Sequence, residues 1–139
     1  MEQNALLCKE SGIHRFFLRF MNNFGFWALA AFTFLYSGIQ LFDLWENGAE
    51  NMAFQIVLNL LLIAAGVLFI RTRFDLAAYN SSGIGELLAA HLVVAAVFIL
   101  WHLTDSGTDE HCLFKAFLFG CWGIALFRYY SSKSYLFKY

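Results

Sequence analysis

Residues 52–70, MAFQIVLNLLLIAAGVLFI, contain no charged side chain and are followed directly by Arg71-Thr72-Arg73. A helix needs about 20 apolar residues to cross the roughly 30 Å hydrocarbon core of a bilayer. Residues 52–70 are close to that length and end at a cluster of positive charge. The segment therefore predicts a membrane-spanning helix.

Three further apolar stretches of similar length occur, at residues 24–42, 84–103 and 112–130. Of the 139 residues, 60% are hydrophobic and only 14% are charged, whereas soluble domains carry roughly 25% charged residues. The chain contains no proline, and the connectors are short: residues 43–51, 71–83 and 104–111. Short connectors make consecutive helices antiparallel. The sequence predicts an all-α fold, a polytopic membrane protein whose two antiparallel helical hairpins form a four-transmembrane-helix bundle.

Lysine and arginine are distributed unevenly between the two ends of these helices. If both termini lie on one side, that side holds eight of the nine basic residues: Lys9, Arg15, Arg19, Arg71, Arg73, Arg128, Lys133 and Lys138. The other side holds Lys115 and six of the ten acidic residues: Asp43, Glu46, Glu50, Asp105, Asp109 and Glu110. Cytoplasmic loops are enriched in Lys and Arg. We therefore expect an integral protein of a bacterial-type inner membrane, with cytoplasmic N- and C-termini.

The segment before the first span has a different pattern. One helical face carries the apolar residues Ile13, Phe16, Phe17 and Phe20. Arg15 and Arg19 point elsewhere, so the pattern predicts an amphipathic helix at the cytoplasmic membrane surface. The resulting organisation is a cytoplasmic segment at 1–23, a transmembrane domain at 24–130, and a basic and aromatic cytoplasmic tail at 131–139.

The two hairpins resemble each other. Trp45 and Trp101, both expected to anchor helix ends at the membrane interface, are 56 positions apart, and Arg71 and Arg128 are 57 positions apart. A duplicated two-helix unit would produce this spacing. The alternative is that any two hairpins with the same orientation share these features.

Several polar side chains lie at membrane depth in the half of the bundle opposite the cytoplasm. They are Ser37, Gln40, Gln55, Asn59 and His102, with Lys115 nearby. Such groups usually face the interior of a bundle. One hypothesis is a polar vestibule that opens outward. The alternative is interhelical hydrogen bonding, which contributes about 0.6 kcal/mol per bond on average.

Small residues are expected to permit close packing of the helices: Gly66, Ala116, Gly120 and Gly123.

His91 lies about 10 Å inside the third span, at 1.5 Å per residue. It would be a gate or proton site, a ligand of haem b, or a neutral imidazole bonded to a backbone carbonyl. His102, three turns away on the same helix, cannot bind the same iron. Glu86 lies on another face of this helix and is expected to pair with a boundary arginine: Arg71, Arg73 or Arg128.

No motif indicates a reaction. Cys8, Cys112 and Cys121 lack the spacing of a metal or redox site, and no catalytic residues are assigned. The acidic cluster of Asp105, Asp109 and Glu110 lacks the spacing of a calcium loop, so we expect a solvated turn and no metal. A net charge of −1 gives no general attraction for nucleic acid.

The leading functional hypothesis is a non-enzymatic interaction, assembly or regulatory subunit without a cofactor. Its 17 Phe residues exceed the need of a four-helix core, which favours contacts with lipid and with other membrane helices. The protein would act as a homo-oligomer or inside a membrane complex. The first alternative is a homo-oligomeric channel or small transporter gated at His91. The second is a membrane anchor that binds haem or quinone near His91.

Overall fold

The computed structural model describes residues 12–48, 50–104 and 111–133. The elements assigned within these ranges are all helices. The elements are α2 (Gly12–Phe20), the π-helix η1 (Met21–Gly25), α3 (Phe26–Asn47), α4 (Met52–Ala77), α5 (Ser82–Thr104) and α6 (Cys112–Ser132). Four helical segments are long and apolar enough to cross a membrane. The predicted all-α four-helix fold is confirmed, and its four spans identify an integral membrane protein.

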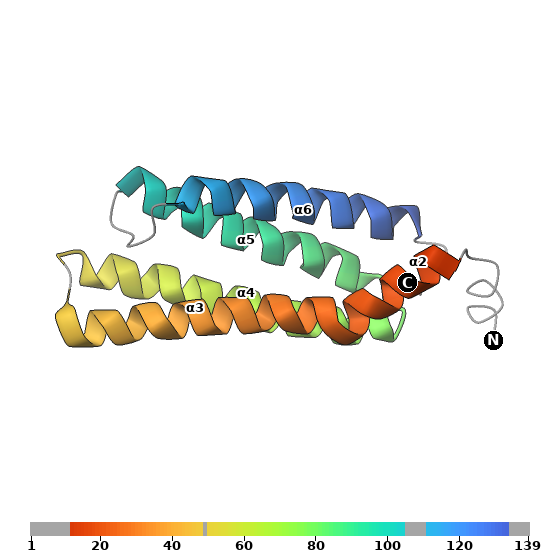
Figure 1. Cartoon of the computed structure of the whole chain (residues 1–139), viewed down its shortest axis with the longest axis horizontal. Helices are drawn as coiled ribbons and strands as arrows, with labels where there is room; N and C mark the ends of the chain where they lie inside the picture. Colours follow the sequence, from red (N-terminus) through yellow and green to blue (C-terminus); the bar gives the residue numbers. More distant parts are fainter. Residues whose placement is uncertain (1–11, 49, 105–110, 134–139) are drawn as a thin grey trace.

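The four long helices run alternately in opposite directions (Figure 1). α3 packs on α4, α4 on α5, and α5 on α6, so the α4–α5 interface joins the two predicted hairpins. α3 and α6 meet through large aromatic side chains. The rings of Phe32 and Phe119 stack with their centroids 5.5 Å apart, and those of Phe26 and Tyr130 lie 6.3 Å apart. These rings close the fourth side of the bundle.

Large side chains of α4 and α5 fill the interior. They include Leu58, Leu62, Phe69, Leu87, Phe98 and Trp101, all of them fully buried. α4 and α5 bury more of their circumference than α3 and α6 because each of them packs against two neighbouring helices. α3 and α6 bury a narrower face and expose many large apolar side chains. Such exposure is stable where the surrounding solvent is lipid.

The helices extend beyond the predicted spans. α4 continues past Ile70 to Ala77, so the predicted connector 71–83 shrinks to residues 78–81. The apolar pattern marks where hydrocarbon contact ends. Backbone hydrogen bonding continues through Arg71, Thr72 and Arg73, whose side chains are compatible with a helix.

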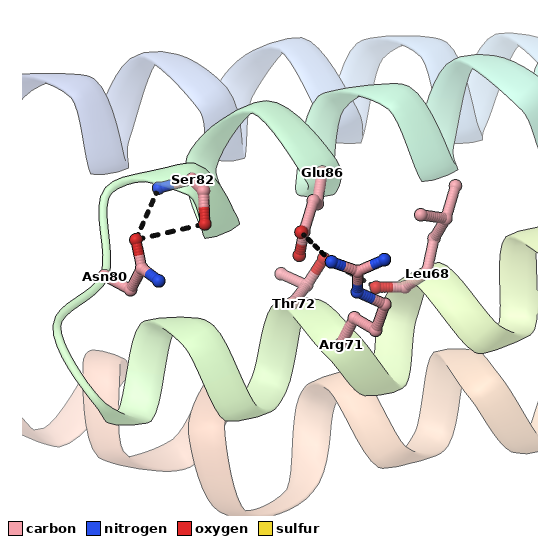
Figure 2. A network of polar contacts seen from close by, with 6 residues as sticks. All are labelled: Leu68, Arg71, Thr72, Asn80, Ser82 and Glu86. Atoms are coloured by element: carbon pink, nitrogen blue, oxygen red, sulfur yellow. Dashed lines mark hydrogen bonds and ion pairs between the residues drawn. The ribbon is translucent and has the colours of Figure 1, made fainter. Parts of the chain in front are cut away.

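α4 ends in a Schellman motif, in which backbone groups beyond the helix satisfy its last carbonyls. The Asn80 N–H donates to the Asp75 carbonyl at 2.7 Å, and the Tyr79 N–H donates to the Leu76 carbonyl at 3.1 Å. Tyr79 has a φ of 55°, a left-handed conformation in which glycine is common. Its ring packs against the core and offsets this strain. Asn80 Oδ1 then accepts hydrogen bonds from the backbone and the hydroxyl of Ser82, where α5 begins (Figure 2).

η1 joins α2 to α3 without a break, a feature that the sequence pattern does not predict. Gly25 makes room for Met21 there, since a Cβ at Gly25 would lie 2.8 Å from the Met21 Cε. From α4, the Arg73 Nε–H donates to the Asn22 carbonyl at 3.0 Å, and the guanidinium lies 5.8 Å from the Trp27 ring centroid. These contacts set the angle at which α2 leaves the bundle.

The predicted amphipathic helix corresponds to α2, with Leu18 buried and Ile13 and Phe16 exposed. The helical path from Arg15 to Asn47 has 33 residues. A straight helix of that length would measure about 50 Å, well beyond the roughly 30 Å hydrocarbon core. A path of this length therefore extends beyond the hydrocarbon core at one end or at both.

Some predictions concern residues outside the described ranges: Cys8, Lys9, the acidic residues Asp105, Asp109 and Glu110, and positions 134–139 of the tail. Ser131 and Ser132, assigned to the tail by sequence, continue α6.

Candidate functional site

Polar residues at membrane depth meet first between α3 and α4. Ser37 and Asn59 are fully buried, and the Ser37 hydroxyl donates to the Asn59 backbone carbonyl at 3.4 Å. The Asn59 Nδ2 donates to the Gln55 carbonyl one turn earlier, at 2.8 Å. The Asn59 Oδ1 is buried and has no hydrogen-bond partner in the part of the chain that the structure describes. The cluster therefore links two helices and retains one unsatisfied acceptor.

Gln55 extends this cluster to α5. Its Oε1 accepts a hydrogen bond from the indole Nε1–H of Trp101 at 2.8 Å, and both side chains are buried. The expectation that Trp101 anchors the helix at the membrane interface is wrong, because the buried acceptor holds its ring inside the bundle. The two residues are 46 positions apart, so no local pattern predicts this hydrogen bond.

Lys115 of α6 points toward aromatic rings from two other helices. Its Nζ lies 5.2 Å from the ring centroid of Tyr36 on α3 and 5.8 Å from that of Phe98 on α5. The electron-rich face of an aromatic ring attracts a cation at such distances. The sequence alone does not predict Tyr36 and Phe98 as site residues, because the contact of their rings with the Lys115 ammonium depends on how the helices pack.

The remaining residues of the proposed vestibule are less buried than this cluster. Gln40 is half-buried, one turn beyond Tyr36 on α3, and His102 is exposed near the end of α5. The structure thus brings Ser37, Gln55 and Asn59 together and leaves His102 on the surface. This arrangement favours interhelical hydrogen bonding as the role of the buried cluster.

His91 is fully buried near the middle of the bundle. Its Nδ1 lies 2.8 Å from the Leu87 carbonyl, which can only accept, so the proton is on Nδ1. The Nε2 then carries a lone pair, and no described residue donates to it. The rings of Phe69 and Phe119 approach the imidazole, with centroids 4.9 and 6.2 Å away.

This geometry suits two of the three interpretations of His91. A neutral imidazole whose Nδ1–H bonds to a carbonyl is the bonded core histidine expected from sequence. It is also the tautomer that binds a metal through Nε2. However, a Cβ at Gly123 would lie 2.8 Å from the His91 Cγ, so α6 packs directly against this side chain. The Nε2 is itself buried, so a haem iron would reach it only if the surrounding side chains moved.

The predicted small residues have different roles. Gly66 permits close packing of α4 on α3, since a Cβ there would lie 2.5 Å from the Thr33 Oγ1. Gly123 permits the contact with His91, and Ala116 is buried. Gly120, in contrast, has nothing within 4 Å of the position its Cβ would take. It is the predicted packing glycine that the described chain leaves without an internal contact.

Charged groups at the arginine-bearing end form one defined pair. An Arg71 Nη lies 3.3 Å from a Glu86 Oε, which joins α4 to α5 (Figure 2). Of the three arginines expected as partners for Glu86, the structure selects Arg71. Arg73 instead binds the backbone of η1, and Thr72 donates to the Leu68 carbonyl within its own helix.

Among the described residues, no three His, Cys, Asp or Glu side chains lie close enough together to hold a metal ion. The described cysteines, Cys112 and Cys121, do not form a disulfide with each other.

The fold and these contacts define the class as an integral membrane protein with a compact four-helix bundle. Comparisons with protein-family models, with curated proteins and with solved structures found no match to the chain.

Proposed function

We propose that this chain is a non-enzymatic interaction, assembly or regulatory subunit that binds other membrane helices through the outer face of α6. The observation that carries the proposal is the open position of Gly120. Gly66 and Gly123 are occupied by contacts within the chain, whereas a Cβ at Gly120 would meet nothing within 4 Å. Small residues in membrane helices allow a second helix to approach closely.

The surroundings of Gly120 fit a helix partner. Large or reactive side chains on the same face of α6 are exposed: Leu113, Phe117, Cys121 and Ile124. They recur at spacings of three and four residues and so form one continuous stripe. Phe117 is 66% exposed and provides a large apolar surface beside the gap at Gly120. A partner helix would pack between Phe117 and Ile124.

The partner is either a second copy of this chain or a helix of another membrane protein. The charge distribution gives the orientation of this chain in the membrane. We propose that the end carrying Arg71, Arg73 and Arg128 is cytoplasmic, in a bacterial-type inner membrane. The enrichment of Lys and Arg at this end supports that assignment.

The test is purification from native cells in mild detergent, followed by measurement of mass and subunit composition. Wild-type protein should retain a stoichiometric partner or a second copy. Gly120→Leu should lower this retention at least about tenfold, because the added side chain fills the space that the partner helix needs. Gly38→Leu is the matched control, since Gly38 is exposed on α3 and also has nothing within 4 Å.

A protein that retains neither a partner nor a second copy would contradict the proposal. A symmetric homo-oligomer that conducts ions in liposomes would also contradict it and would support the channel alternative. Loss of that flux in His91→Ala would then assign the gate. An absorption spectrum of the same preparation tests the anchor alternative, which requires a haem Soret band that disappears in His91→Ala.

A further inference from the structure

An apolar groove of about 320 Å³ lies between α2 and the second half of α6. Its lining consists of Ile13, Phe17, Trp122, Ala125, Leu126 and Tyr129. Ligand-binding pockets in proteins begin near this volume. The side chains of Trp122 and Tyr129 contribute one polar group each, and the other four lining side chains are hydrocarbon. The groove therefore suits a hydrocarbon chain better than a polar molecule.

The walls of the groove are positioned by contacts on two sides. The Phe17 ring meets the Tyr129 ring edge-on, with centroids 4.9 Å apart, and so fixes α2 against α6. On the other side, the hydrogen bond from Arg73 to the Asn22 carbonyl fixes η1, from which α2 extends. Ala125 is small between larger neighbours on α6. The space is thus a built feature of the fold, and it lies on a different face of α6 from Gly120.

The two helices that line the groove carry basic side chains and no acidic ones. α2 carries Arg15 and Arg19, and the end of α6 carries Arg128, followed by Lys133. Neither α2 nor α6 contains an Asp or Glu within its described bounds. Basic residues at a membrane surface attract anionic lipid headgroups within a Debye length. The groove is therefore accompanied by the charge that a negatively charged amphiphile requires.

The place of the groove in the bundle determines the depth of its apolar lining and of the basic side chains in the bilayer. Its α6 residues belong to the fourth span, in the half nearer the arginine-bearing end, and its α2 residues belong to the short helix at that same end of the bundle (Figure 1). A lipid of that leaflet has its acyl chains at the depth of Trp122 and its phosphate at the level of α2. The lipid would then meet apolar side chains at the depth of its acyl chain and basic side chains at the level of its phosphate.

We propose that this groove binds one acyl chain of an anionic phospholipid whose headgroup lies among Arg15, Arg19 and Arg128. An isoprenoid quinone would also place a hydrocarbon tail there, but its neutral head would gain nothing from the surrounding positive charge. The proposal is independent of the helix partner at Gly120, because a different face of α6 carries it.

The first experiment is native mass spectrometry of the full chain in detergent, with equal amounts of phosphatidylglycerol and phosphatidylcholine added. Wild-type protein should retain one phosphatidylglycerol, at least about tenfold more often than phosphatidylcholine. Ala125→Phe fills the groove and should abolish this preference. Ala31→Phe, an equivalent change at an exposed position on α3, should leave it unchanged. Equal retention of the two lipids, or an unchanged preference in Ala125→Phe, would overturn the proposal.

A second measurement does not depend on filling the groove. The fluorescence of Trp122, taken as the difference between wild type and Trp122→Phe, is recorded in phosphatidylcholine bilayers that contain a few per cent of acyl-brominated lipid. Brominated phosphatidylglycerol should quench it at least about twofold more than brominated phosphatidylcholine. The combined Arg15→Gln and Arg128→Gln substitutions should remove that excess.

Equal quenching by both lipids would show ordinary contact with bulk lipid and would overturn the proposal. Absence of quenching by either lipid would show that a protein segment fills the groove, which would overturn it as well.

Discussion

The buried imidazole of His91 is accommodated because Gly123 of the neighbouring helix has no side chain. A similar contact occurs in the other hairpin, where Gly66 receives Thr33. In a bilayer no hydrophobic effect drives one helix against another, so close van der Waals packing and interhelical hydrogen bonds stabilise the bundle instead. These two close contacts at glycine are therefore expected to stabilise the bundle.

Gly123→Ala should destabilise the bundle, because the new Cβ overlaps the His91 side chain. Overpacking a well-packed interior typically costs about 1–3 kcal/mol. The measurement is thermal or denaturant unfolding of the purified protein in detergent. Gly120→Ala is the control and should be neutral or slightly stabilising, since the position is open and alanine favours a helix.

Combining Gly123→Ala with His91→Gly tests whether the effect acts through the His91 side chain, whose Cβ is the atom nearest to a Cβ added at Gly123. The double variant should lose less stability than the sum of the two single variants, because the overlap is gone. Additive losses would mean that Gly123 matters for another reason.

At the scale of the element, the joint between α2 and α3 is the feature with the clearest mechanical role. A π-turn shifts the hydrogen-bond register by one residue, and the Asn22 carbonyl of η1 accepts from Arg73 on α4. Arg73 also lies over the rings of Trp27 and Phe74. One arginine thus couples α2 to the first hairpin.

Arg73→Gln should loosen this joint without unfolding the bundle. A hydrogen bond from a charged donor contributes about 1.5–3 kcal/mol, so backbone amides of Met21–Gly25 should exchange with solvent deuterium at least roughly tenfold faster. Mass spectrometry of exchanged peptides measures this rate. Arg71→Gln is the matched control, because its ion pair with Glu86 joins α4 to α5 and does not touch η1. Equal acceleration in both variants would contradict the assigned role.

The sequence predicts the existence of the helices well and their joints poorly. Long apolar segments such as 52–70 have few structural alternatives in lipid, and the arginine cluster near Glu86 limits its partners to three. The π-turn at Met21–Gly25 depends on an arginine 51 positions away from Asn22, and the Trp101 indole depends on Gln55. Such contacts follow from how the helices are rotated against each other, which a single-helix pattern does not contain.

At the scale of the whole molecule, the two hairpins bury corresponding positions at the offset of 57 that relates Arg71 to Arg128. In the outgoing helices the buried pairs are Phe26 and Gly83, Ala30 and Leu87, Thr33 and Ala90, and Ser37 and Val94. In the return helices they are Gln55 and Cys112, Asn59 and Ala116, Gly66 and Gly123, and Phe69 and Leu126. The offset of 57 relates these buried positions in both helices of the unit, whereas Trp45 and Trp101 are 56 positions apart; the shared burial supports the hypothesis of a duplicated hairpin.

Orientation is a property of the whole chain and is tested by reporter fusions. A fluorescent protein fused after Tyr139 should fluoresce in bacterial cells, since the C-terminus is expected in the cytoplasm. Alkaline phosphatase fused after Asn47 should be active, because that end of α3 is expected on the opposite side. The reverse pair of results would invert the proposed topology. Inversion would also move the anionic-lipid groove to the other leaflet.

The turn between α4 and α5 limits how copies of this molecule can associate. Residues 78–81 reach about 14 Å when fully extended, little more than the 8–10 Å between packed helix axes. While this turn stays folded, the second hairpin therefore packs on the first hairpin of its own chain. Copies that associate with their turns folded do so as intact bundles, which can separate again without unfolding.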